Sequence, residues 1–247
     1  MSLRSDFLGP ELIRRTNYQG DPYHVMRNEL KIGKEPDYGE GTPVPATSDL
    51  GELRKKAAKC QACPLFRNAT QTVFGEGGAG VVFIGEQPGD QEDKAGKPFV
   101  GPAGQILDRA LKVVGIDRSQ CYVTNAVKHF KWKPRGKRRI HEKPNSREIE
   151  ACRPWLIAEL HCLQPESIVC LGASAVRSAF GKDLPVLKSR GRWMTSLMGP
   201  KTLITVHPSS ILRAPDEAAK ERAFADFVAD LNLVAESIGS ERTLRSL

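Results

Sequence analysis

The stretch Val81-Val82-Phe83-Ile84-Gly85-Glu86-Gln87-Pro88-Gly89 joins an apolar, largely β-branched run to a turn rich in Gly and Pro. A short apolar run without polar alternation is typical of a strand that is buried on both faces. Three similar runs follow at 122–127, 167–172 and 202–207, and helical patterns separate them at 103–114, 146–163, 173–180 and 217–234. This alternation predicts an α/β fold, a three-layer α/β/α domain with a central, mainly parallel four-stranded sheet.

The regular pattern begins at Asp49, which we expect to cap the first helix of the domain. Before it, residues 35–48 are rich in Pro, Gly and Thr, a composition typical of a linker, and residues 11–30 favour a short helix. The predicted division is an N-terminal extension and linker, one folded domain and a C-terminal tail, at residues 1–48, 49–240 and 241–247.

The net charge of +8 and the pI near 9.2 favour a polyanionic partner, most simply nucleic acid. No stretch reaches the roughly 18 apolar residues of a membrane span. The first ten residues lack the apolar core of a secretory signal. We therefore expect a cytoplasmic protein without a membrane partner, and we expect a monomer.

Polar residues follow several of the predicted strands. Glu86 and Gln87 follow the first strand, Asn125 lies near the end of the second, and His207-Pro208-Ser209-Ser210 follows the fourth. Ligands of open parallel sheets bind beyond the carboxyl ends of the strands, so these segments should converge on one edge. The sequence therefore predicts a functional site at that edge.

A basic segment also belongs to this edge. Residues 128–147 hold nine Lys and Arg against one acid, Glu142, and include Lys137-Arg138-Arg139-Ile140-His141. Such a run with interleaved aromatic side chains favours phosphate binding, and we expect DNA contacts from Lys137, Arg138 and Arg139. Composition alone leaves two roles open for His141: one more phosphate contact, or the group that does chemistry.

Six cysteines in a reducing compartment favour thiols over a disulfide framework. Cys152 and Cys162 are ten residues apart on one predicted helix, about 15 Å along its axis, so both cannot bind one compact group. The consistent metal-ligand set is Cys60, Cys63, Cys152 and Cys170. Four thiolates suit zinc or a [4Fe–4S] cluster, and four unrelated core cysteines remain the alternative.

Three motifs resemble those of the uracil-DNA glycosylase superfamily, and the iron–sulfur family-4 enzymes are the most similar. The first motif comprises 85–89, 92–94 and 98–104, and the others are Thr124-Asn125-Ala126-Val127-Lys128 and His207-Pro208-Ser209-Ser210-Ile211-Leu212-Arg213. The resemblance covers about residues 50–235. It implies a uracil-DNA glycosylase-like fold, a [4Fe–4S] cluster on the four cysteines, and uracil-containing DNA as the partner.

The resemblance also implies roles for single residues. Phe99 would stack on the uracil that is flipped out of the helix, and the amide of Asn125 would bind its N3–H and O4. His207 would stabilise the negative charge that develops on the departing uracil. The remaining substrate-binding residues that we expect are Gly85, Asp93, Ser209 and Arg213.

Two features depart from ordinary family-4 enzymes and resemble the UdgX subfamily, which becomes covalently attached to uracil-containing DNA. They are Gln87 at a position usually held by a small residue, and the insertion 135–141. His141 then matches the attacking residue, Glu86 would fix its tautomer, and Gln87 would support them.

Our hypothesis is a single-turnover glycosylase that excises uracil and stays linked to the deoxyribose C1′ through His141. We expect it to act on single-stranded DNA, in repair or uracil sensing. Two alternatives are an ordinary multiple-turnover family-4 uracil-DNA glycosylase, in which His141 only helps to bind DNA, and a non-catalytic basic nucleic-acid-binding module.

Overall fold

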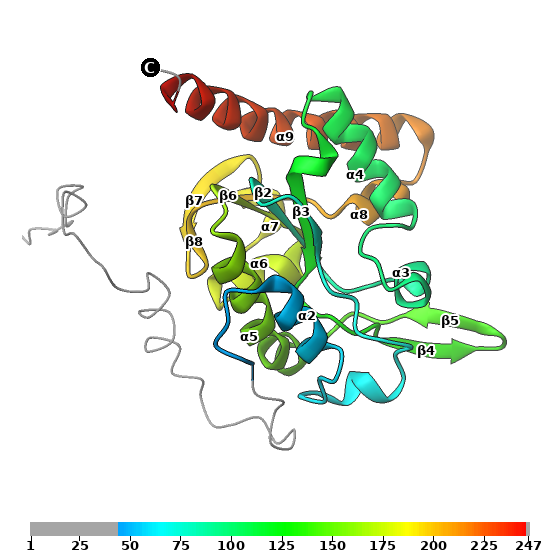
Figure 1. Ribbon diagram of the computed structural model, residues 1–247. Coiled ribbons are helices and arrows are strands. Elements are labelled where there is room, and N and C mark those ends of the chain that lie inside the picture. Colours follow the sequence, from blue (N-terminus) through cyan, green and yellow to red (C-terminus); the bar gives the residue numbers. More distant parts are fainter. Residues whose placement is uncertain (1–43, 246–247) are drawn as a thin grey trace, which may run out of the picture. The chain divides into compact units, whose positions relative to one another are not determined.

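The computed structural model describes residues 44–245 (Figure 1). Everything below concerns the described part of the unit 34–247. The expected helix at 11–30 and most of the expected extension lie outside the described residues. The bounds of the predicted domain therefore stay a prediction.

The central sheet has six strands in the order β1-β3-β2-β6-β8-β7. Its four inner strands are parallel, as predicted: β2 (Val81–Gly85), β3 (Cys121–Asn125), β6 (Ser167–Leu171) and β8 (Gly199–Thr205). Two antiparallel edge strands were missed, β1 (Glu76–Gly77) and β7 (Arg192–Ser196). Their sequences are short or polar, so neither produces an apolar run.

Helices cover both faces of the sheet, which confirms the three-layer fold (Figure 1). One face packs against α4 (Pro102–Val113), α8 (Pro208–Leu212) and α9 (Glu217–Arg245), and the other against α5 (Ser146–Leu163) and α6 (Ala173–Phe180). Successive strand residues alternate between the two cores: Phe83 lies with the α4 side and Ile84 with the α5 side. No helix among the described residues has the length and apolarity to cross a membrane.

A third apolar cluster joins α2 (Leu50–Ala57) to the first half of α5. Asp49 caps α2 as predicted, because its carboxylate accepts hydrogen bonds from the backbone N–H groups of Gly51 and Glu52. The remaining helical elements are short: η2 (Pro64–Arg67), α3 (Asp90–Ala95), η3 (Arg118–Gln120) and α7 (Val186–Ser189).

The basic segment forms a β-hairpin. Strands β4 (Trp132–Arg135) and β5 (Arg138–His141) pair antiparallel, with Trp132 opposite His141. Gly136 makes the reversal with a left-handed φ of 59°, a conformation that costs glycine little. Residue His141 therefore lies at the base of the hairpin, where β5 returns to the domain.

Candidate active site

A cavity of about 980 Å³ opens where the parallel strands end. Its walls come from the turn after β2, the start of α4, the end of β3, the base of the hairpin, the start of α6, α7 and the segment 206–213. The predicted site residues that line it are Glu86, Gln87, Phe99, Asn125, His141, His207, Ser209 and Arg213. The predicted convergence on one edge is therefore present.

Phe99 and Asn125 are held in place by glycines. A Cβ on Gly85 would lie 2.4 Å from Asn125 Oδ1 and 2.7 Å from Phe99 Cζ, so only glycine lets both side chains approach β2. Phe99 itself has a left-handed φ of 56°, and a Cβ on Gly104 would lie 1.8 Å from the Phe99 carbonyl oxygen. Gly85 thus shapes the pocket by leaving space.

His207 caps α8 and enters the cavity as a neutral ring. The backbone N–H of Ser209 donates to His207 Nδ1 at 3.1 Å. Loss of solvent, and then the nearby Arg213 and His141, lower the pKa of His207 from 6.5 to about 4. Because Nδ1 accepts, the proton of the neutral ring is on Nε2, which makes Nε2–H a hydrogen-bond donor. Arg213 Nη1 donates to Ser209 Oγ at 3.1 Å.

His141 faces Glu86 across the cavity mouth. Its Nε2 lies 3.3 Å from Glu86 Oε1, and the His141 side chain is 47% exposed. The other carboxylate oxygen, Oε2, accepts a hydrogen bond from Ser174 Oγ at 2.7 Å. Sequence reasoning missed Ser174, although it follows strand β6 as the other site residues follow their strands. The same strand-end rule, applied to β6, would have found it.

Gln87 forms hydrogen bonds with both strands at the base of the hairpin. Its Nε2 donates to the carbonyls of Lys131 at 3.1 Å and Glu142 at 3.0 Å, and its Oε1 accepts from the Lys131 N–H at 3.1 Å. Lys131 precedes β4 and Glu142 follows β5, so one amide binds both ends of the hairpin. We expected Gln87 among the catalytic groups; its contacts position the strand end that carries His141.

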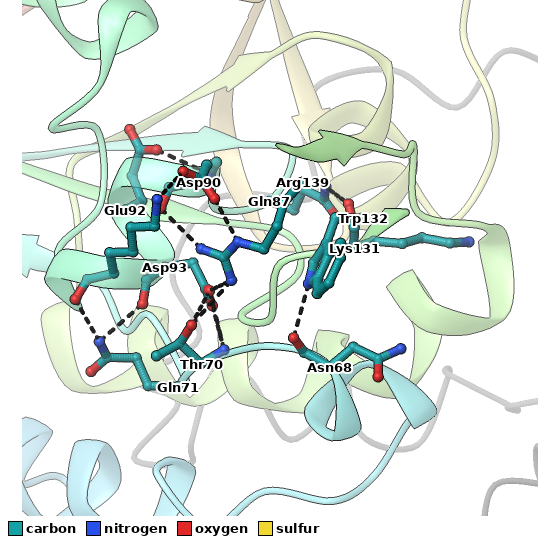
Figure 2. Close-up of polar contacts among 12 residues, drawn as sticks. Asn68, Thr70, Gln71, Gln87, Asp90, Glu92, Asp93, Lys131, Trp132 and Arg139 are labelled. Carbon is teal, nitrogen blue, oxygen red and sulfur yellow. Dashed lines mark hydrogen bonds and ion pairs between the residues drawn. The ribbon is translucent and has the colours of Figure 1, made fainter. Parts of the chain in front are cut away.

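Arg139 makes a second anchor for the hairpin (Figure 2). Its Nε lies 2.6 Å from Asp90 Oδ1 and its Nη1 lies 2.6 Å from Asp93 Oδ2. The guanidinium also lies over the rings of Phe130 and Trp132, at 5.3 and 5.5 Å from their centroids.

This geometry corrects two expectations. Arg139 was expected to contact DNA, but its guanidinium points into the domain because two carboxylates bind it there. Asp93 was expected to contact substrate, but it is fully buried and accepts hydrogen bonds from Thr70 as well (Figure 2). Lys137 and Arg138 are exposed at the hairpin turn, and their contact with DNA stays a prediction.

The cysteines meet only in part. Cys60, Cys63 and Cys152 lie in one cluster between α2 and α5, whereas Cys170 points from β6 into the core beside α6. Burial, with a smaller contribution from the neighbouring thiols, raises the pKa of Cys63 to about 11 and that of Cys152 to about 12. The four-cysteine set therefore does not fit this structure, and among the described residues no group of three or more His, Cys, Asp or Glu is close enough to hold a single metal ion.

His129 follows a residue that contacts this cysteine group. The backbone N–H of the preceding Lys128 donates to Cys152 Sγ at 3.2 Å. The His129 ring is buried, with Nε2 2.9 Å from Thr72 Oγ1, and burial lowers its pKa to about 4. The ring is therefore neutral, the form in which imidazole binds metals.

Comparison with known proteins agrees with the geometry. Residues 72–232 match the model of the uracil DNA glycosylase superfamily. The chain is 42% identical over 165 residues to the Type-4 uracil-DNA glycosylase of Thermotoga maritima, covering 65% of this chain and 82% of that protein. It is 38% identical over 176 residues to the Type-4 enzyme of Pyrobaculum aerophilum, covering 68% and 86%.

Proposed function

This chain belongs to the uracil-DNA glycosylase superfamily, and we propose that it excises uracil from DNA and then stays bound to the deoxyribose through His141. The observation that carries the proposal is the position of His141. Its ring lies 3.3 Å from Glu86 at the mouth of the cavity that Phe99, Asn125 and His207 also line. Assignment to the UdgX subfamily is part of this proposal and is supported by Gln87 and the hairpin.

The pocket residues divide the work of base recognition. A base must leave the stack to reach this cavity, at a cost of a few kcal/mol. Phe99 would stack on the flipped uracil, and the Asn125 amide would accept from its N3–H and donate to its O4. Cytosine presents the opposite donor and acceptor pattern at these positions. Asn125 therefore supplies selectivity for uracil.

His207 acts on the leaving group. When the bond between C1′ and uracil N1 breaks, its electron pair leaves with the base as an anion. The Ser209 N–H donates to Nδ1 of His207, so the neutral ring carries its proton on Nε2. The Nε2–H can then donate a hydrogen bond to the developing anion. A donor fixed before the reaction needs no reorganisation during bond cleavage.

His141 then competes with water for the electron-poor C1′. The Glu86 carboxylate accepts a hydrogen bond from the Nε2–H of His141, so the free lone pair for attack is on Nδ1. A new bond between nitrogen and C1′ replaces the glycosidic bond, and the ring proton can pass to Glu86. Since no group is left to release the sugar, each molecule turns over once.

We further propose that Cys60, Cys63 and Cys152 hold a [4Fe–4S] cluster, with His129 in place of the expected fourth cysteine. The support is the grouping of the three thiols and the neutral, buried imidazole of the residue that follows Lys128, whose backbone N–H contacts Cys152 Sγ. Bound there, the cluster would join α2 to α5 and stabilise the fold. Loss of absorbance near 400 nm in Cys60→Ser, with Cys170→Ser unaffected, would support this ligand set.

One experiment separates the hypothesis from its two rivals. The protein is incubated with a labelled single-stranded oligonucleotide that contains one uracil, and the products are run on a denaturing gel. A heat-stable shifted band supports the covalent adduct. Steady release of many uracils per protein indicates an ordinary glycosylase, and salt-sensitive binding without release indicates a binding module.

A further inference from the structure

Lys128 and Glu159 form an ion pair deep beneath the site, and the proposed chemistry uses neither. Their side chains are 1% and 0% exposed, and Lys128 Nζ contacts Glu159 Oε2 directly. A buried ion pair is costly, and replacing one by apolar residues often leaves stability unchanged. Stability alone is therefore a weak explanation for this pair.

Each charge makes further hydrogen bonds. Lys128 Nζ donates to Thr124 Oγ1 at 2.6 Å and to the carbonyl oxygen of Asn125 at 2.9 Å. Glu159 Oε1 accepts from Tyr122 OH and from the Gly75 N–H, both at 3.0 Å. The pair thus ties the end of β3 to helix α5 and to the segment before β1.

We propose that Lys128, held by Glu159, is a positioning residue for uracil recognition. Its Nζ donates to the backbone carbonyl of Asn125, and Asn125 is the residue that lines the cavity and would bind uracil. The Asn125 side chain packs closely over Gly85 of β2. A small shift of the end of β3 would therefore move the amide relative to the cavity. A misplacement of about 1 Å in a reactive complex can cost 100-fold in rate. The proposal rests on the function proposed above.

The same lysine connects the pocket to the cysteine group. Its backbone N–H donates to Cys152 Sγ, whereas its side chain holds Asn125. A change at the cysteines therefore reaches the base-recognition residue through one amino acid.

A double-mutant cycle tests the positioning role. Lys128→Met with Glu159→Gln removes both charges and keeps an acceptor for Tyr122. We expect its single-turnover uracil excision to fall about 10-fold or more, with DNA binding unchanged. In an Asn125→Ala background the same pair of substitutions should have almost no further effect, because it acts through Asn125. Additive losses in the two backgrounds would overturn the proposal.

Tyr122→Phe is the matched control. It removes a hydrogen bond to the same carboxylate without touching Asn125, so its excision rate should stay within about twofold of the unsubstituted protein. If the charge-free variant does not fold, Thr124→Val takes its place in the cycle, since it removes one anchor of Lys128 Nζ. An inactive unsubstituted protein would refute the proposed glycosylase function instead, which distinguishes the two failures.

Discussion

The two histidines at the cavity have opposite environments. His207 is partly buried at the start of α8, with Nδ1 bound by the Ser209 N–H and a pKa lowered to about 4. His141 is half exposed at the end of a hairpin, and its Nε2 lies 3.3 Å from Glu86 Oε1. A ring fixed in one tautomer suits a donor to a leaving group, and a ring at the cavity mouth suits attack on the sugar.

The supports of the two rings differ as well. His207 is held by its own helix, through residues next to it in sequence. His141 depends on contacts from distant segments: Gln87 at both ends of the hairpin and Asp90 and Asp93 on Arg139. Substitutions far from His141 should therefore change its reaction without changing that of His207.

The largest effect is expected for His141→Ser. The covalent band should disappear completely, while uracil release continues, because water replaces the ring at C1′. Denaturing gels and uracil release, measured on the same samples, check both halves. Persistence of the band would show that another residue is the nucleophile.

His207→Ala should impair both products. Removing one donor to a developing charge typically costs 100- to 1,000-fold in rate, so excision should fall by about that factor. Crosslinking should fall equally, because it follows bond cleavage. A variant that kept normal excision and lost only the crosslink would reverse the two assignments.

Arg139→Gln should separate attack from cleavage. Loss of the ion pairs to Asp90 and Asp93 loosens the hairpin, so we expect the fraction of crosslinked product to drop about 10-fold while excision changes little. Arg138→Gln is the matched control, because its side chain is exposed in the same strand. Equal losses of crosslinking in both variants would indicate a DNA contact rather than positioning.

The sequence predicted what depends on local pattern. Helices α5 and α6 begin and end at the expected residues, and Asp49 caps α2. The strand-end rule also brought His141 and His207 to one cavity. The direction of a side chain on a short polar hairpin has no such signal. Arg139 on that hairpin was therefore assigned to DNA, although two carboxylates bind it. Asp93 on the short helix α3 was assigned to substrate, although it is buried against Thr70 and Arg139.

The prediction that Cys170 is a metal ligand was wrong for a related reason. Spacing shows that a strand returns beside a helix, but the alternation along β6 decides which core each thiol enters. Cys170 enters the core beside α6, apart from the other three thiols. The sequence pattern predicts strand β6, but the core that the Cys170 thiol enters depends on how the strand packs.

Ser174→Ala should give a smaller effect on the exposed histidine alone. Ser174 Oγ donates to Glu86 Oε2, so its loss leaves Glu86 free to turn away from His141. We expect crosslinking to slow about three- to tenfold, and Ser174→Thr to restore it if the hydroxyl is what matters. Excision measured alongside should stay unchanged, because His207 has separate supports.

The smallest expected effect is on stability against pH, and it belongs to His207. Its pKa is about 4 in the folded protein and 6.5 in an unfolded chain, so the unfolded state binds more protons between these values. Stability therefore falls as the pH is lowered from 6.5 to about 4. In His207→Asn this contribution is absent, and the free energy of unfolding from denaturant titrations should fall less steeply over that range. Identical slopes would mean that the pKa of His207 is the same in the folded and unfolded protein, and the lowered pKa that keeps its ring neutral would then be wrong.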